Sequence, residues 1–295
     1  MLAILIIADH FGNVFGDQWP FTSGWCWWGG TSVACFFFMS GYGLAVSYLK
    51  APVAYLSTFF SKRFSRLLPP FVLLTVVAIG LRIWLLHESG TDILSGFIHG
   101  HPPLWTSWFI FALLYYYVAF YLSCRLMRQP LRAGIMLVAL TLLYMICVRR
   151  LGWGGYWYSS IMAANVGYFV AVYSRAVDKA ISQKARLVLP LLAVSLIVAA
   201  LAAAYRREYF QPLLTLALPA VVYAVIVTRH VRWPRLLVWI GGFSYEVYLA
   251  QGLLAGLIPY LTPAVAVVLF PVGSVMLAYL LHRFDGMPFL HRLRA

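Results

Sequence analysis

The chain has 295 residues, of which 63% are apolar and only 10% are charged. A soluble domain has about 45–50% apolar and about 25% charged residues, so this composition excludes an ordinary soluble enzyme and predicts an integral membrane protein. The net charge of +14 would suit a nucleic-acid partner, but the positions of the basic residues indicate a membrane topology instead. We therefore expect no nucleic-acid partner.

Ten apolar runs approach the length of about 20 residues that a transmembrane helix needs. They predict an all-α, polytopic membrane protein with about ten transmembrane helices, in a single domain over residues 1–295 without a soluble domain. The first run is short for a span, so we expect its helix to be N-terminally truncated and the natural chain to begin upstream. The runs cover residues 1–16, 29–49, 67–87, 104–127, 132–149, 157–175, 185–204, 211–228, 236–258 and 261–281.

Basic residues are concentrated in every second connection between these runs. Seventeen of the 22 lysines and arginines fall in one set of loops, and four fall in the alternate set. The positive-inside rule predicts that the first set is cytoplasmic, which places both termini in the cytoplasm. Attraction to anionic headgroups accounts for the excess of positive charge. The first set comprises Lys50, Lys62, Arg63, Arg66, Arg125, Arg128, Arg132, Arg175, Lys179, Lys184, Arg186, Arg229, Arg232, Arg235, Arg283, Arg292 and Arg294.

The first run leads directly into two ionisable residues, Asp9 and His10. An ionisable side chain in hydrocarbon is costly and indicates a functional site, and an imidazole exchanges a proton readily near neutral pH. The alternative is that both residues merely end a short helix at the outer interface. Adjacent side chains on a helix point about 100° apart, so Asp9 is poorly placed to orient His10.

The second run contains a polar interruption, FFFMSGYGL, over residues 36–44. Ser40 and Tyr42 supply hydroxyl groups within an otherwise apolar helix. Gly41 allows a ligand or another backbone to approach closely. Small residues are also common where membrane helices touch, so helix packing is the alternative interpretation.

Two arginines lie just before the third run, in the segment SKRFSRLLPP. Arg63 and Arg66 are three residues apart and share one face of a helix. Two guanidinium groups at a cytoplasmic helix end suit the binding of phosphates, although anchoring to lipid headgroups is the alternative. Pro69 and Pro70 predict that the third span begins or kinks at this point.

Tryptophans gather at the outer ends of the predicted spans. Trp105 and Trp108 begin the fourth run and are candidates to stack on a sugar, with an aromatic belt as the alternative. Four more tryptophans crowd the first external loop with the same alternative: Trp19, Trp25, Trp27 and Trp28.

Histidines and cysteines do not form a metal-binding pattern. His99 and His101 are close in sequence, but no third ligand accompanies them. The four cysteines form no CxxC pair. We therefore expect no metal site and no disulfide framework.

A carboxylate lies within the ninth run, in the segment IGGFSYEVYLAQ. Glu246 follows two hydroxyl residues, Ser244 and Tyr245. A buried carboxylate needs a partner or it becomes protonated, and Arg82, Arg63, Arg66 or His10 could be that partner. A purely structural ion pair is the alternative to a catalytic role.

The ordered set of segments resembles the acyltransferase-3 family of bacterial membrane proteins, which O-acylate carbohydrates on cell-surface or exported glycans. The resemblance is carried by the histidine of the first span and by FFFMSGYG, KRFSRLLPP, PLWTSWFIF and GGFSYEVYL, over nearly the whole chain. It implies a multi-pass enzyme of the inner (plasma) membrane that transfers an acyl group, most often acetyl. The donor is acyl-coenzyme A on the cytoplasmic side, a substrate rather than a bound cofactor, and the acceptor is a carbohydrate or lipid-linked glycan reached from outside.

The resemblance also implies roles for individual residues. His10 matches the essential histidine, which acts as general base, and Arg63 and Arg66 match the paired arginines that hold the phosphates of coenzyme A. We expect Glu246, or a hydroxyl such as that of Tyr42 or Ser40, to orient His10. The candidates for the substrate pocket are Ser40, Tyr42, Trp105, Trp108, Ser244 and Tyr245.

Two positions depart from the family pattern. The family usually has an arginine eleven residues before the histidine, a position that would precede Met1. The family's SY-x-x-YL segment is often followed by histidine, where this chain has Gln251. We therefore expect that Gln251 is not a catalytic acid or base.

Two other functions use the same residues. A transporter or flippase of a lipid-linked glycan or small solute could use the intramembrane charges as a pathway, but the sequence has no internal repeat of the kind that marks many transporters. A membrane sensor or scaffold without chemistry is the third interpretation, and the ordered motifs argue against it.

Overall fold

The computed structural model describes residues 2–15, 29–205, 207–228 and 234–285. Within these ranges the chain forms helices joined by turns, and no strand. The first half contains α1 (Leu2–Phe15), α2 (Gly29–Lys50), α3 (Pro52–Ser57), α4 (Phe59–Leu86), α5 (Gly90–Ile98), α6 (Ser107–Leu126) and α7 (Pro130–Arg150).

The second half is more finely divided. Its helices are α8 (Met162–Val172), α9 (Ser174–Gln183), α10 (Ala185–Tyr205), α11 (Arg207–Thr228), α12 (Arg235–Gly242), α13 (Ser244–Leu257), α14 (Pro263–Val268) and α15 (Ser274–Asp285). A 3₁₀ turn at Gly155–Trp157 precedes α8, another at Ile258–Tyr260 follows α13, and a π-helical turn at Leu269–Gly273 joins α14 to α15.

The prediction of an all-helical membrane protein is confirmed. In the part of the chain that the structure describes, five helices are long and apolar enough to cross a membrane, and two shorter apolar helices accompany them, Leu2–Phe15 and Thr215–Thr228. The five are Gly29–Lys50, Phe59–Leu86, Ser107–Leu126, Pro130–Arg150 and Pro263–Arg283.

Each of the ten predicted apolar runs is occupied by helix, but the structure supports five spans among the described residues rather than about ten. The run 157–175 contains the 11 residues of α8 after a 3₁₀ turn and is interrupted at Tyr173, before α9 begins. The run 236–258 is interrupted at Phe243, which ends α12 just after two glycines and precedes α13. The side of the membrane on which the termini lie stays a prediction.

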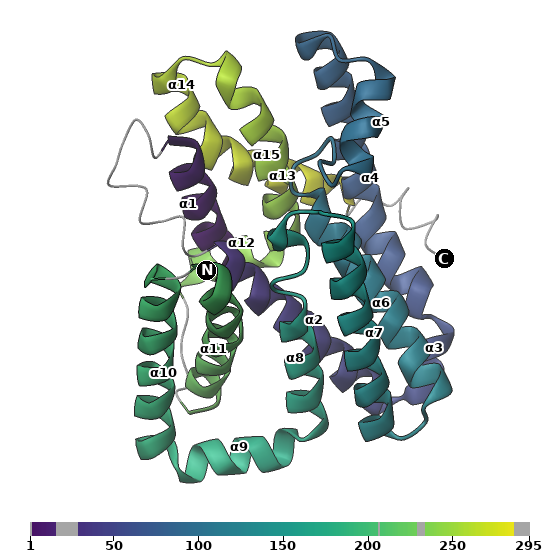
Figure 1. Ribbon diagram of the computed structural model, residues 1–295, viewed down its shortest axis with the longest axis vertical. Helices are drawn as coiled ribbons and strands as arrows, with labels where there is room; N and C mark the ends of the chain where they lie inside the picture. The colour runs from purple at the N-terminus through teal and green to yellow at the C-terminus, as the bar shows by residue number, and fades with distance from the viewer. Residues whose placement is uncertain (1, 16–28, 206, 229–233, 286–295) are drawn as a thin grey trace.

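The elements divide between two ends of the molecule (Figure 1). In that view α3 and α9 lie toward the lower end, α5 and α14 lie toward the upper end, and α4 runs between the two ends. Many of the basic residues assigned to one membrane side belong to the lower end, where α2 leads into α3 and α8 leads into α9.

The closest helix pairing joins α2 to α8. A Cβ atom added to Gly41 would collide with the backbone of Ala164, and one added to Gly167 would collide with the backbone carbonyl of Phe38. The absence of both side chains lets the two helices approach to backbone contact, as small residues do in membranes. The interpretation of Gly41 as a packing residue is therefore confirmed.

Pro69 and Pro70 lie inside α4, which begins at Phe59, so they do not mark the start of the helix. Prolines cannot donate backbone hydrogen bonds, so this turn of α4 loses two of its helical bonds. The Tyr245 hydroxyl of α13 donates to the Leu67 carbonyl at 2.7 Å in the same region. Tyr245 thereby joins α13 to α4 beside the proline pair.

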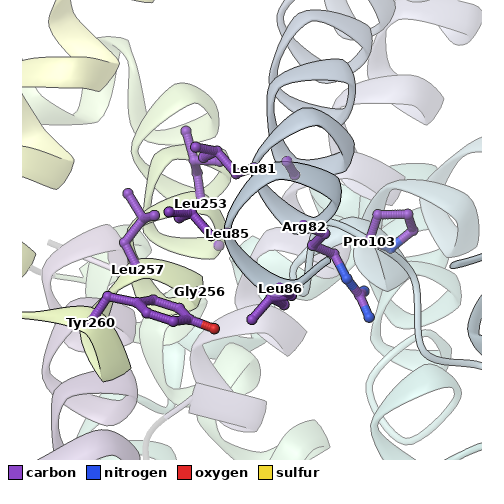
Figure 2. Close-up of a pocket in the computed structure, with 11 residues that line it drawn as sticks. Leu81, Arg82, Leu85, Leu86, Pro103, Leu253, Gly256, Leu257 and Tyr260 are labelled. Atoms are coloured by element: carbon purple, nitrogen blue, oxygen red, sulfur yellow. The ribbon is translucent and has the colours of Figure 1, made fainter. Parts of the chain in front are cut away.

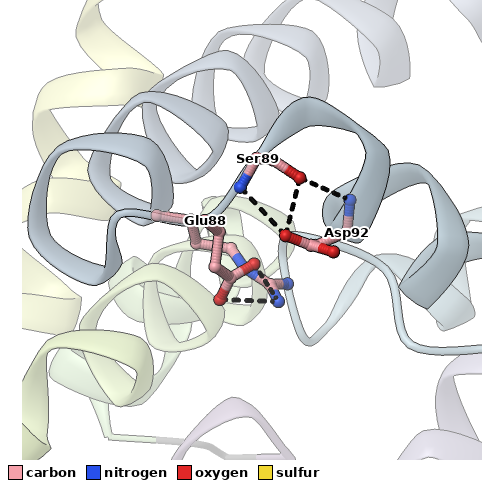
Figure 3. A network of polar contacts seen from close by, with 4 residues as sticks. Glu88, Ser89 and Asp92 are labelled. Carbon is pink, nitrogen blue, oxygen red and sulfur yellow. Dashed lines mark hydrogen bonds and ion pairs between the residues drawn. The ribbon is translucent and has the colours of Figure 1, made fainter.

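A polar network lies at the C-terminal end of α4 (Figure 3). His87, with φ of 52°, turns the chain back so that Glu88 reaches Arg82. Arg82 donates to the two oxygens of Glu88 at 2.9 and 3.1 Å. Ser89 and Asp92 form the capping box that begins α5, and the hydrogen bonds from the Ser89 hydroxyl and amide hold the pKa of the Asp92 carboxyl below its usual value.

Asp9 connects the first two helices. Its carboxylate, which is buried, accepts the backbone N–H of Gly29 at 2.8 Å and the Asn13 amide at 3.1 Å. Gly29 is the first residue of α2, so the carboxylate meets the positive end of that helix. A Cβ atom on Gly29 would collide with this carboxylate.

We predict that Asp9→Ala lowers the stability of the purified protein by about 0.5–2 kcal/mol, the usual cost of a lost helix cap. Asp9→Asn should cost less, because its carbonyl oxygen can still accept from Gly29. Thermal unfolding in detergent measures both variants. An Asp9→Ala protein with the same melting temperature as the wild type would contradict the capping role.

Candidate functional site

His10 lies where α1 meets α13 and the segment that begins α6. Its ring centroid is 4.6 Å from that of Trp105 and 6.4 Å from that of Tyr248. The His10 side chain is only partly buried, and the Trp105 indole is 41% exposed. The imidazole is thus enclosed on one side by the protein and remains reachable on the other.

The polar atoms around His10 lack hydrogen-bond partners. His10 Nδ1 is buried and unpaired, as are both Oε1 and Nε2 of Gln251, although the Gln251 side chain lies within interacting distance of the His10 ring. The Thr106 hydroxyl is also buried and unpaired, and it lies against Gly252, the residue after Gln251. His10, Gln251 and Thr106 together form the unpaired polar cluster.

Burying such a cluster lowers the stability of the folded protein. An unsatisfied buried donor or acceptor costs about 1–3 kcal/mol, and native proteins contain few of them. A group of them beside an ionisable ring marks a place where a ligand supplies the missing partners. This places the candidate site at the contact of α1, α6 and α13.

Asp9, the sequence neighbour of His10, faces the start of α2 instead. Its described hydrogen bonds go to Gly29 and Asn13. This agrees with the helical geometry that separates adjacent side chains by about 100°. Asp9 therefore positions α1 rather than the imidazole.

Glu246 has a different partner from the four considered in the sequence. Its Oε1 is 3.2 Å from His282 Nδ1, and the carboxylate is 6% exposed. Glu246 lies in the first turn of α13 and His282 in the last turn of α15, where the helix dipoles favour a negative and a positive charge respectively. The pairing with Arg82, Arg63, Arg66 or His10 is wrong, since Arg82 pairs with Glu88 and Glu246 joins two helices.

Arg63 and Arg66 share one face of α4, as predicted. Arg63 Nη2 donates to the Tyr55 hydroxyl at 2.8 Å. Both guanidinium groups lie near the Tyr117 hydroxyl. The Ser40 hydroxyl lies within hydrogen-bonding reach of the same Tyr117 hydroxyl. Arg66 is exposed and Arg63 partly exposed, so both can bind an anion.

The other candidate pocket residues do not converge on His10. Tyr42 lies against Tyr223, with ring centroids 5.7 Å apart, and Tyr223 donates to Asp178 of α9. Trp108 lies against Tyr156, with centroids 5.6 Å apart. Ser244 lines a separate apolar cavity of about 280 Å³ with Leu2, Ala3 and others. Of the predicted substrate residues, the structure brings Trp105 to His10 and Ser40 toward the two arginines.

Two site residues were missed or undervalued in the sequence. Gln251 was set aside because it cannot act as acid or base, and Thr106 was passed over between two tryptophans. A signal for Gln251 existed in its position two residues after the segment GGFSYEVYL, where the family often has a histidine. Only the fold shows that it faces the first helix.

A pocket of about 180 Å³ lies between α4 and α13 (Figure 2). Leu81, Leu85, Leu253 and Leu257 line it, with Gly252 next to the unpaired polar cluster. Arg82 also borders the pocket, but its charge is already paired with Glu88. The pocket is therefore unsuited to the phosphates of coenzyme A.

The tryptophans of the first external loop lie outside the described residues. Cys26 lies there as well. The other three cysteines are free, with Cys35 and Cys124 buried and Cys147 exposed.

Comparison with known protein families identifies the chain's family. The model of the acyltransferase-3 family, described as an acyltransferase domain, matches residues 1–283. No curated protein and no solved structure matches the chain. The match includes the unpaired polar cluster, Arg63, Arg66 and the Glu246–His282 pair.

We predict that Glu246 and His282 contribute to stability as a pair. Glu246→Gln and His282→Gln should each lower the melting temperature, and the double variant should lower it by less than the sum, with a coupling of at least about 0.5 kcal/mol. Folded Glu246→Gln protein should keep most of its acyl transfer. Loss of transfer without loss of stability would instead assign Glu246 to the chemistry.

Proposed function

Because the chain belongs to the acyltransferase-3 family, we propose that it transfers an acyl group, most often acetyl, from acyl-coenzyme A to a hydroxyl of a cell-surface or exported carbohydrate. The observation that carries this proposal is the partly exposed His10 ring beside buried polar atoms that have no partners. A neutral imidazole in that setting is available as general base. The family match favours this chemistry over the transporter alternative.

The reaction needs one proton acceptor at the acyl acceptor. A ring nitrogen of His10 takes the proton of the carbohydrate hydroxyl while its oxygen attacks the thioester carbonyl carbon. The carbon–oxygen bond forms, and the carbonyl oxygen becomes a transient oxyanion. As the carbon–sulfur bond breaks, the proton passes from His10 to the sulfur of coenzyme A, so the enzyme ends the cycle unchanged.

The proposed donor site consists of Arg63 and Arg66. Its distance from His10 along α6 matches the length of the pantetheine arm of coenzyme A. Tyr117 lies beside the arginines, while Phe109 contacts Tyr248, which lies near His10. The eight steps from Phe109 to Tyr117 rise about 12 Å along α6. The pantetheine arm has about twelve bonds, the length of four extended residues, or about 14 Å. An arm of that length reaches from the arginines to the level of His10.

The proposed acceptor site is on the exposed side of Trp105. The indole is 41% exposed and lies against the His10 ring. An aromatic face packs well on the apolar face of a sugar ring, and it would hold an acceptor hydroxyl close to the imidazole. We assign this side to the exterior and the arginine end to the cytoplasm, in the plasma membrane, by the positive-inside rule.

The donor site is tested by neutralising the arginines. Arg63→Ala/Arg66→Ala should weaken acetyl-coenzyme A binding by about tenfold or more, since charge-assisted hydrogen bonds to phosphate are lost. Lysine at both positions should restore only part of the affinity, because an ammonium cannot bind bidentately. Titration calorimetry on purified protein measures each constant.

The matched control is Arg125→Ala/Arg128→Ala, which removes one exposed arginine from the last turn of α6 and another from the connection to α7. This control should leave the affinity unchanged. Wild-type affinity in the Arg63/Arg66 variant would reduce that pair to an anchor for lipid headgroups.

The general base is tested at His10. His10→Ala should keep expression, membrane insertion and acetyl-coenzyme A binding but lose acyl transfer by about 10²–10⁴-fold. Asn and Gln should fail too, because neither takes a proton, whereas Asp9→Asn should cost much less. The rate of the wild type should fall as pH decreases and His10 becomes protonated, and this acid limb should vanish from the residual activity of His10→Ala.

The control for this series is His99→Asn, an exposed histidine at the outer end of α5. It should transfer acyl groups at the wild-type rate. Label from radioactive acetyl-coenzyme A, counted in the glycan fraction of host membranes, measures every variant. A His10→Ala protein with near-normal transfer defeats the mechanism.

A further inference from the structure

Gln251 is the most deeply buried polar side chain of the unpaired polar cluster. Its exposed fraction is 0%, and neither its carbonyl oxygen nor its amide nitrogen has a hydrogen-bond partner. The side chain lies beside the His10 ring. The structure thus holds an unpaired donor and acceptor next to the proposed general base.

The other buried side chains without hydrogen-bond partners are weaker evidence for a ligand. Most are hydroxyl groups on helices, such as those of Ser32, Thr75 and Ser123. A serine or threonine can change its side-chain rotamer and donate to the carbonyl one helical turn before it. The planar carboxamide of Gln251 carries both a donor and an acceptor, and the His10 ring beside it can satisfy only one of them. The remaining group is available to a ligand.

Resting on the proposed function, we propose that Gln251 Nε2–H donates a hydrogen bond to the oxyanion that forms on the thioester carbonyl. The His10 ring beside this side chain is only partly buried, so the thioester carbonyl can approach from the exposed side of the imidazole. A fixed donor in a water-excluded site stabilises developing negative charge without reorganisation. Gln251 is then a catalytic residue that is neither acid nor base.

The step balances without another reactant. The acceptor oxygen bonds to the carbonyl carbon, and the carbonyl π electrons move to its oxygen, which accepts the Gln251 hydrogen bond. When the carbon–oxygen double bond re-forms, the electrons of the carbon–sulfur bond leave with sulfur, which takes the proton held by His10. Gln251 keeps both of its protons throughout.

A competing role is that the Gln251 carbonyl orients the His10 ring. The two roles demand different atoms, so two substitutions separate them. Gln251→Glu keeps an acceptor for His10 but places a negative charge where the oxyanion forms. Gln251→Met keeps the size of the side chain and removes both polar atoms.

We expect Gln251→Met to lower kcat by about 10²–10³-fold, the usual effect of removing one oxyanion donor. The acid limb of the pH profile should remain, because His10 is intact, and the affinity for acetyl-coenzyme A should stay the same. The melting temperature should rise, since an unsatisfied buried amide is replaced by an apolar group. Gln251→Glu should be at least as inactive as Gln251→Met.

The control is Ser123→Ala, which removes a fully buried, unpaired hydroxyl elsewhere on α6 and should keep wild-type kcat. The assay is transfer of labelled acetyl from acetyl-coenzyme A to host-membrane glycans by the full chain. Near wild-type kcat in Gln251→Met overturns the proposal, and near wild-type kcat in Gln251→Glu assigns Gln251 to orienting His10 and overturns it too. Normal transfer by His10→Ala would instead sink the proposed function itself, so the two failures are distinguishable.

Discussion

The hydrogen bond from the Gly29 amide to Asp9 fixes how α1 is turned, and with it the direction of His10 at the candidate site. It joins the short first helix to the start of α2 at 2.8 Å. Because side chains on a helix are fixed relative to one another, holding Asp9 toward α2 turns His10 toward α13. The absence of a side chain at Gly29 is part of the same constraint, since a Cβ atom there would displace the carboxylate.

The fold class could be predicted from the sequence, because the apolar composition and the length of the apolar runs are local properties that can be read without the fold. A run of apolar residues predicts a helix wherever it lies, and each of the ten runs contains helix. The number of spans was harder to predict, because breaks such as that at Phe243 depend on how α12 and α13 pack. Pro69 and Pro70 predict that a helix begins or kinks there. The prediction of a start is wrong, because α4 begins ten residues before Pro69, and the kink stays a prediction.

The candidate site was predictable where the signal is local and not where it depends on the fold. Arg63 and Arg66 share a face because they are three residues apart, and that spacing is visible in the sequence. The partner of Glu246 lies 36 residues away on α15, and no local pattern indicates His282. Gln251 meets His10 across some 240 residues of chain, so its place in the site could be learned only from the packing of α1 on α13.

The distribution of charge explains why a neutral cluster lies at the centre of the site. Three carboxylates occupy helix N-termini: Asp9 at α2, Asp92 in α5 and Glu246 in α13. Helix dipoles stabilise charge there, whereas His10, Gln251 and Thr106 are uncharged or only transiently charged. Neutral groups can stay unpaired at far lower cost than buried ions. Such a site is nearly uncharged before the substrates bind. When negative charge develops on the thioester carbonyl during transfer, a fixed hydrogen-bond donor such as Gln251 is needed to stabilise it.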